Sequence, residues 1–155
     1  MFKKALLTLA TAASVIGGSA MAQPGGDYLI ETLLQEGVEI TVEPCKGEDY
    51  YGRFKFYPGQ WRGREIEICT NVGNEAMRWE TLRHEAVHVA QHCRDPHNME
   101  TIMVDGWVQK NHDRSEWPLV RDGYPRNRWD VEMEAFTLED YSNEFVADMV
   151  KHNCG

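Results

Sequence analysis

The stretch His84-Glu85-Ala86-Val87-His88 places two imidazoles and a carboxylate within little more than one helical turn. Residues i and i+4 of an α-helix lie on one face, so the rings of His84 and His88 can reach a single metal ion. Glu85 is rotated by about 100° from His84 around the helix axis, which places it beside such an ion, where a general base is needed. The pattern has this meaning only inside an unbroken helix, which makes the surrounding sequence decisive.

The surrounding sequence predicts that helix. From Asn74 onward the hydrophobic period changes from two to about 3.6 residues, and Asn74 itself is a suitable N-cap. Residues 74–93 contain neither Gly nor Pro. His84 and His88 therefore fall in the middle of a long predicted helix.

The remaining periodicity predicts an α+β fold. Residues 38–45, 51–57 and 64–70 alternate apolar and polar side chains and are joined by short connections, as in a small antiparallel sheet. Helical spacing is found before them at 27–36 and returns at 129–150, with an interruption expected near Tyr141 to Asn143. We expect the sheet to pack on the His84–His88 helix and on the C-terminal helix.

The segment between these helices is harder to interpret. Residues 99–111 have helical spacing, although Gly106 weakens the prediction. Residues 112–128 are polar and are interrupted by Pro118, Gly123 and Pro125, which predicts a long loop.

The first 22 residues have the pattern of a secretory signal peptide. A basic start (Lys3-Lys4) is followed by the apolar residues 5–16 and by Ala-Met-Ala at 20–22, a small-x-small cleavage site. The apolar stretch is shorter than the roughly 20 residues that a helix needs to cross a bilayer. We therefore expect residues 23–155 to form one secreted or periplasmic domain that has no membrane attachment after cleavage.

The charge balance excludes two classes of partner. The chain has 25 Asp and Glu against 16 Lys and Arg, a net charge of −9, and loss of the signal segment would make it more acidic. Such a domain is repelled by nucleic acid and by anionic lipid headgroups. The composition gives no indication of the oligomeric state.

The four cysteines predict disulfides rather than a metal site. Their number is even, which suits an oxidising compartment, and none of them forms a C-x-x-C pair of the kind common in zinc sites. Three pairings are possible. We favour Cys45–Cys69, which brackets the β-rich segment, and Cys93–Cys154, which would connect two predicted helices.

A tetrahedral zinc held by two histidines needs a third protein ligand and leaves one position for water. His92 continues the same helical face, but it lies about 12 Å along the axis from His84, too far to share one ion in a straight helix. A carboxylate from the last predicted helix is the better candidate, within Val131-Glu132-Met133-Glu134-Ala135.

At this point the chain resembles a known family. His84-Glu85-x-x-His88 followed by Glu132-x-Glu134-Ala135 is similar to the gluzincin type of zinc metallopeptidase, particularly its minimal single-domain versions. The resemblance covers residues 66–92 and 124–136. It implies a zincin-like fold, a bound Zn²⁺, a peptide or protein substrate, and Glu132 as the third metal ligand.

Two other carboxylates stay open as ligands. Glu134 lies nearer than Glu132 to the centre of the helix's apolar face, and Glu144 begins an N-E-x-x-x-D stretch that some gluzincins use.

The chain also departs from the family pattern. Many gluzincins carry Asp or Asn four residues after the ligand to support a histidine, whereas this chain carries Phe136.

The resemblance also implies a mechanism, in which zinc lowers the pKa of a water molecule and Glu85 takes its proton and passes it to the leaving amine. Tyr124, and less favourably His112, are candidate donors to the developing oxyanion. The substrate backbone is expected to pair with an exposed edge strand, and residues 64–70 are the candidate for this strand.

Two other functions compete with peptide hydrolysis. A zinc-binding or partner-binding module without catalysis is favoured by the missing support at Phe136, whereas the intact Glu85 favours an enzyme. In the third hypothesis the chain is a structural domain held by disulfides and the histidine pattern is accidental.

Overall fold

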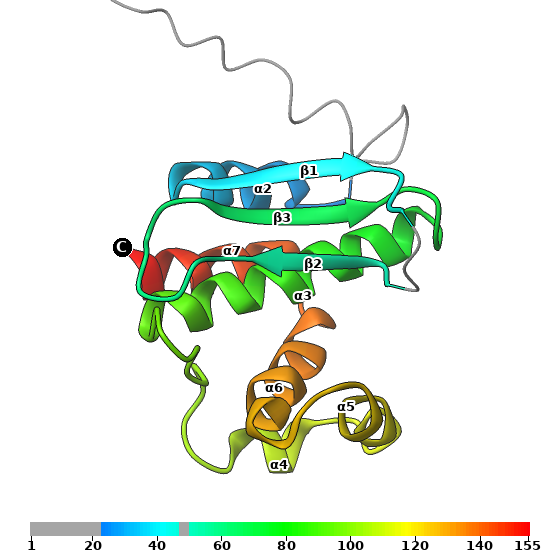
Figure 1. The fold of residues 1–155 in the computed structure, drawn as a ribbon, viewed down its shortest axis with the longest axis vertical. Helices are drawn as coiled ribbons and strands as arrows, with labels where there is room; N and C mark the ends of the chain where they lie inside the picture. The colour runs from blue at the N-terminus through cyan, green and yellow to red at the C-terminus, as the bar shows by residue number, and fades with distance from the viewer. Residues whose placement is uncertain (1–22, 47–49) are drawn as a thin grey trace, which may run out of the picture.

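The computed structural model of the protein describes residues 23–46 and 50–155, and the expected signal segment lies outside these residues. The α+β class is confirmed. The elements used below are α2 (Gly26–Gln35), β1 (Val38–Glu43), β2 (Gly52–Lys55), β3 (Arg64–Cys69), α3 (Glu75–Arg94), α4 (Trp107–Asn111), α5 (Trp117–Gly123), α6 (Trp129–Glu139) and α7 (Asn143–Cys154) (Figure 1).

The sheet of the described residues has the order β1-β3-β2 and is mixed rather than antiparallel. β2 and β3, which are joined by residues 56–63, form the expected antiparallel pair. β1 pairs with β3 in parallel, from Val38 opposite Arg64 to Glu43 opposite Cys69. The chain reverses its direction once before β2 and once after it, and β3 then enters between its two predecessors. The prediction of an entirely antiparallel sheet was therefore wrong for β1.

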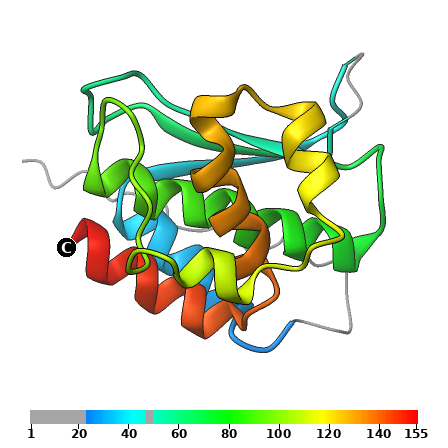
Figure 2. The ribbon, with the colours of Figure 1, turned by 90° about the horizontal axis from the view of Figure 1, so that it is seen from below.

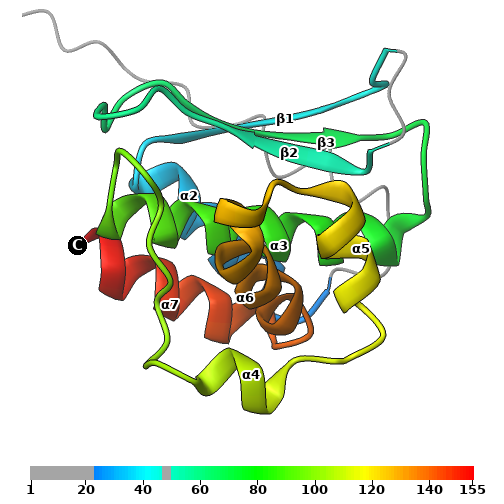
Figure 3. The ribbon, with the colours of Figure 1, turned by 60° about the horizontal axis from the view of Figure 1, so that its bottom comes forward.

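The predicted helix around the histidines is confirmed as α3, and it lies at the centre of the molecule. Asn74 is its N-cap, and the Asn74 side chain accepts a hydrogen bond from the Met77 N–H. Every residue from His84 to Cys93 is buried, because α3 is covered by the sheet on one side and by α6 and α7 on the other (Figure 3). A helix buried all round needs no single apolar face.

The sheet packs on α3 and α2, whereas α7 packs against these two helices from the side away from the sheet (Figure 3). The sheet was expected to contact the C-terminal helix. Instead, α7 forms a third layer, separated from the sheet by α2 and α3. The approach of β2 to α3 depends on Gly52, where a Cβ atom would lie 2.6 Å from both Thr81 Cγ2 and the Glu67 carbonyl oxygen.

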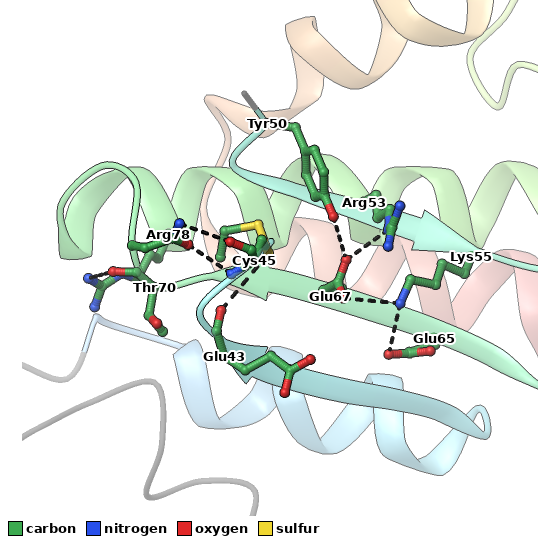
Figure 4. Close-up of a disulfide and its surroundings, with 11 residues drawn as sticks. Glu43, Cys45, Tyr50, Arg53, Lys55, Glu65, Glu67, Thr70 and Arg78 are labelled. Atoms are coloured by element: carbon green, nitrogen blue, oxygen red, sulfur yellow. Dashed lines mark hydrogen bonds and ion pairs between the residues drawn. A yellow bond between two sulfur atoms is a disulfide. The ribbon is translucent and has the colours of Figure 1, made fainter. Parts of the chain in front are cut away.

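Both favoured disulfides are confirmed. Cys45–Cys69 joins the ends of the parallel strands β1 and β3 (Figure 4), with 5.1 Å between the Cα atoms, and Cys93–Cys154 joins the ends of α3 and α7, with 5.0 Å. Two disulfides are typical of a chain that folds in an oxidising compartment. Within the described residues, no helix is long and apolar enough to cross a membrane.

The segment before α6 differs from the prediction. The helix expected at 99–111 is reduced to α4, because Met99 and Gly106 adopt left-handed backbone angles with φ of 58° and 77°. The loop expected at 112–128 contains α5, whose first turn accepts Pro118 since its missing N–H needs no partner there. The interruption expected near Tyr141 is confirmed between α6 and α7.

Candidate metal centre

The crossing of α6 over α3 brings His84, His88 and Glu132 together (Figure 2). All three side chains are buried. Glu132 Oε2 lies 3.1 Å from His88 Nε2 and 3.6 Å from His84 Nε2. One ligating atom from each residue lies within 4.8 Å of the other two.

These separations suit a small metal ion. Ligands at about 2.0–2.1 Å from a tetrahedral ion are about 3.3 Å apart, close to the two measured distances to Glu132. Two imidazoles and one carboxylate also provide the donor atoms that bind zinc and related divalent ions. The group could therefore hold a metal ion, and among the described residues it is the one set of three metal-ligating side chains with this spacing.

Each histidine is oriented by a partner on its other ring nitrogen. His84 Nδ1 lies 2.6 Å from Glu139 Oε2, and His88 Nδ1 lies 2.7 Å from Gln91 Oε1. If each Nδ1 carries the proton and donates it to these acceptors, both Nε2 atoms keep their lone pairs for a metal. The support that Phe136 cannot give is thus supplied by Glu139, seven residues and two helical turns after Glu132.

A second set of hydrogen bonds fixes Gln91 and explains the position of Glu134. Gln91 Nε2 donates to the Val131 carbonyl and to Glu134 Oε2, both at 2.9 Å. The buried Glu134 carboxylate also accepts from the backbone N–H groups of Ile102 and Met103, at 2.7 to 2.9 Å. Glu134 is therefore engaged by Gln91 and by the backbone of residues 102–103, and it is not a member of the ligand group.

The remaining candidates for the third ligand lie elsewhere. Glu144 is exposed on α7, close to Gly25. His92 is buried among Phe54, Phe56 and Trp61 of the β2–β3 side, and neither of its ring nitrogens has a hydrogen-bond partner in the described residues. His92 is thus neither solvated nor in contact with the candidate centre, because β2 covers this part of α3.

The charges of the site are strongly coupled. Burial alone lowers the pKa of His84, but hydrogen bonds with Glu132 and Glu139 outweigh it and raise this pKa to about 10. Burial alone raises the pKa of Glu132, but His88 and His84 hold it far below its usual value. Arg128 Nη2, 3.1 Å from Glu132 Oε1, adds a positive charge beside the second carboxylate oxygen. Without a metal, the carboxylates therefore hold a proton on His84 that a metal would displace.

A cavity of about 400 Å³ opens beside this group, between β2, α3, α5 and α6. Its walls contain Glu85 and Tyr124, the two residues predicted to be catalytic. His112 lines a different cavity and its Nδ1 lies 2.8 Å from the Val108 carbonyl oxygen, so the structure does not bring it to the site. The full lining is Tyr50, Tyr51, Gly52, Met77, Glu80, Thr81, His84, Glu85, Glu116, Leu119, Tyr124, Phe136 and Glu139.

Sequence reasoning missed Glu139, Gln91 and Arg128. Each has a spacing signal that points to the site: Glu139 lies seven residues after Glu132, Gln91 lies three after His88, and Arg128 lies four before Glu132. Spacings of three, four and seven residues return to the same helical face. The signal was therefore present, but many other polar residues share it.

Comparison with known proteins gives a family but no activity. The family model described as a domain of unknown function (DUF8637) matches residues 32–154, which is most of the chain. The chain belongs to the DUF8637 family. No curated protein and no solved structure matches it. For this DUF8637 protein, the functional evidence is therefore the site itself.

Proposed function

We propose that this protein is an exported zinc metallopeptidase of the gluzincin-like type, which hydrolyses peptide bonds with Glu85 as the general base. The observation that carries the proposal is the convergence of His84, His88 and Glu132 beside a cavity whose walls include His84 and Glu85. The two disulfides support an oxidising, extracytoplasmic location.

Zinc fits the donor set best, because two neutral imidazoles and one carboxylate are a frequent ligand set of catalytic zinc. When bound, zinc lowers the pKa of a water molecule towards 7 and polarises the substrate carbonyl. The chain contributes the orientation of its ligands: Glu139 and Gln91 hold the two imidazoles, and Arg128 holds Glu132. The support at Glu139 removes the observation that favoured a non-catalytic module.

Glu85 has the surroundings of a general base. Its side chain is buried beside the cavity, and burial raises its pKa above the usual value. A carboxylate with a raised pKa takes a proton from water more readily and later returns it to the leaving amine. The charges of His84 and His88, and then the backbone N–H of Phe54, act in the opposite direction and keep this pKa from rising further.

Tyr124 is the proposed donor of a hydrogen bond to the developing oxyanion. It follows α5 directly and lines the same cavity as Glu85. Burial, and then the charges of Glu132 and Glu85, raise the pKa of its phenol, so the hydroxyl keeps its proton at neutral pH.

The edge strand beside the cavity is β2 and not residues 64–70, which form the central strand β3. The Tyr51 carbonyl accepts from the Cys69 N–H, so the alternation of an antiparallel pair turns the backbone groups of Gly52 and Phe54 away from β3. An extended peptide could add to this edge next to Glu85.

The proposal is tested by measuring zinc and turnover together. We expect the purified protein to contain one zinc per chain, by mass spectrometry, and to hydrolyse casein or a fluorogenic peptide. Glu85→Gln should keep the zinc and lower kcat by at least about a hundredfold, since it removes a general base. Glu31→Gln, at an exposed position of α2, is the matched control and should behave as the parent does.

Two results would contradict the proposal. Zinc-loaded Glu85→Gln protein that hydrolyses peptides as fast as the parent excludes the mechanism. Protein that binds zinc stoichiometrically but hydrolyses no peptide supports the non-catalytic module instead.

A further inference from the structure

A carboxylate oxygen without a partner is buried near the candidate metal centre. Glu116 is the N-cap residue of α5, and its side chain lines the same cavity as His84 and Glu85. Its Oε2 is buried and has no hydrogen-bond partner among the described residues. Buried carboxylate oxygens are normally paired. Protein covers Oε2, so a bound molecule would contact Glu116 through its other carboxylate oxygen, Oε1, which is not buried in this way.

The cavity has an excess of negative charge around Glu116. Four of its lining residues are glutamates, and none of the described lining residues is Lys or Arg. Glu85 and Glu139 already have roles in the proposed site. Glu80 and Glu116 form no salt bridge with any described residue. The cavity therefore offers carboxylates to a cation that the protein itself does not supply.

The surroundings of Glu116 strengthen this preference. Burial, followed by the charges of Glu139, Asp140 and Asp113, raises the pKa of Glu116 to about 7. A positive group bound at this position is attracted by all of these carboxylates at once, and in a partly buried site this attraction is only weakly screened.

A second metal ion is a poor match for this position. Within the described part of the chain, Glu116 does not belong to any group of three metal-ligating side chains. A single carboxylate suits an ammonium or guanidinium group instead. The cavity is also lined by the exposed side chains of Tyr51, Leu119 and Tyr124, which suit the methylene groups that carry such a cation.

We propose that Glu116 binds a cationic group of the substrate beside the metal centre, so that this DUF8637 protein selects peptides with a nearby ammonium or guanidinium group. The inference rests on the proposed peptidase function for the nature of the ligand. A lysine or arginine side chain and a free N-terminal amine offer the same chemistry, so the test separates them.

Binding is measured in zinc-loaded Glu85→Gln protein, so that the result does not depend on turnover. The ligands are acetylated, amidated alanine hexapeptides with one lysine at each position in turn, and matching peptides with norleucine, which lacks the charge. A third set carries norleucine and a free N-terminus. Calorimetry should show that at least one cationic peptide binds about tenfold more tightly than its neutral match.

Glu116→Gln in the same background should abolish this preference, whereas the control Glu31→Gln should keep it. Glu116→Lys should make the neutral peptide the tighter ligand. Unchanged zinc content and an unchanged unfolding temperature show that each variant is folded. A preference seen only with the free N-terminus identifies the amine as the cation, and one seen with internal lysine identifies the side chain.

Equal binding of cationic and neutral peptides, or a preference that persists in Glu116→Gln, overturns the inference. These outcomes differ from failure of the proposed function, which is read from peptide turnover by protein with an intact Glu85. A protein without turnover that still shows a Glu116-dependent preference retains the cation site and loses only the peptidase assignment.

Discussion

The three buried histidines of α3 follow one helical face, but they lie in opposite environments because His84 and His88 are next to α6, whereas His92, one turn further on, is next to β2. Next to α6, His84 and His88 have acceptors on Nδ1 and a carboxylate close to Nε2. Next to β2, His92 packs against Phe54 and neighbouring aromatic rings, and its nitrogens have no partner in the described residues. The residue type and the helix are the same in both places. The partner element therefore decides whether a histidine can bind a metal.

The largest expected difference between the two environments is in their response to pH. With a pKa raised to about 10, His84 is protonated in the metal-free protein at neutral pH, and zinc has to displace that proton. The apparent zinc affinity should therefore rise about tenfold per pH unit, or about a hundredfold between pH 6 and pH 8. Burial lowers the pKa of His92, so His92 should contribute nothing to the pH dependence of the zinc affinity.

The pH dependence of the zinc affinity is measured by competition with a chelator at several pH values, after correction for the chelator's own protonation. In the metal-free protein, the contribution of His84 to stability changes with pH in the opposite direction to the zinc affinity. Because its folded-state pKa is raised, His84 stabilises the fold fully below about pH 6.5 and loses this contribution as the pH rises towards 10. A zinc affinity independent of pH would contradict the proposed protonation of His84.

An intermediate effect is expected from the partner of His84. Glu139→Gln keeps a hydrogen-bond acceptor but removes the charge that polarises the imidazole, so zinc affinity should fall about tenfold. Equilibrium dialysis against buffered zinc measures this change, with Glu31→Gln as the control for net charge. An unchanged affinity would show that the supporting interaction is not needed for metal binding.

The smallest effect is expected where α3 packs against β2. His92→Leu replaces a buried polar ring without partners by an apolar side chain of similar volume, which removes a desolvation cost. The free energy of unfolding should stay the same or rise by up to about 1 kcal/mol, with zinc content unchanged. Chemical denaturation gives the free energy of unfolding, and a loss of zinc in this variant would show that the part of α3 next to β2 is coupled to the part next to α6.

The same contrast shows what could be predicted from the sequence. Asn74, the absence of Gly and Pro, and the histidine spacing were sufficient for α3, because these are local signals. The choice of Glu132 over Glu134 depended on the family resemblance, since the amphipathic pattern pointed to Glu134. The structure explains this conflict: both glutamates are buried, and each has its own partners.

Non-local features were harder to predict. The parallel pairing of β1 depends on β3 entering between two earlier strands, and no local pattern encodes that choice. The burial of His92 depends on aromatic side chains about 35 positions away in the chain. Glu139 had the correct spacing, but only the packing of α6 on α3 distinguishes it from a solvated helix residue.

The disulfide between Cys93 and Cys154 has a consequence for the order in which the centre matures. It closes a ring with a sequence separation of 61 that contains both Glu132 and Glu139, and it begins five residues after His88. While the thiols are reduced, packing α6 on α3 has to overcome the full loop-closure entropy of the open chain. The disulfide lowers that entropy in the unfolded chain, so less of it is lost when α6 packs on α3. Oxidation thus preorganises the candidate metal centre, and under the proposed function the chain would gain its full capacity for metal only where its thiols are oxidised.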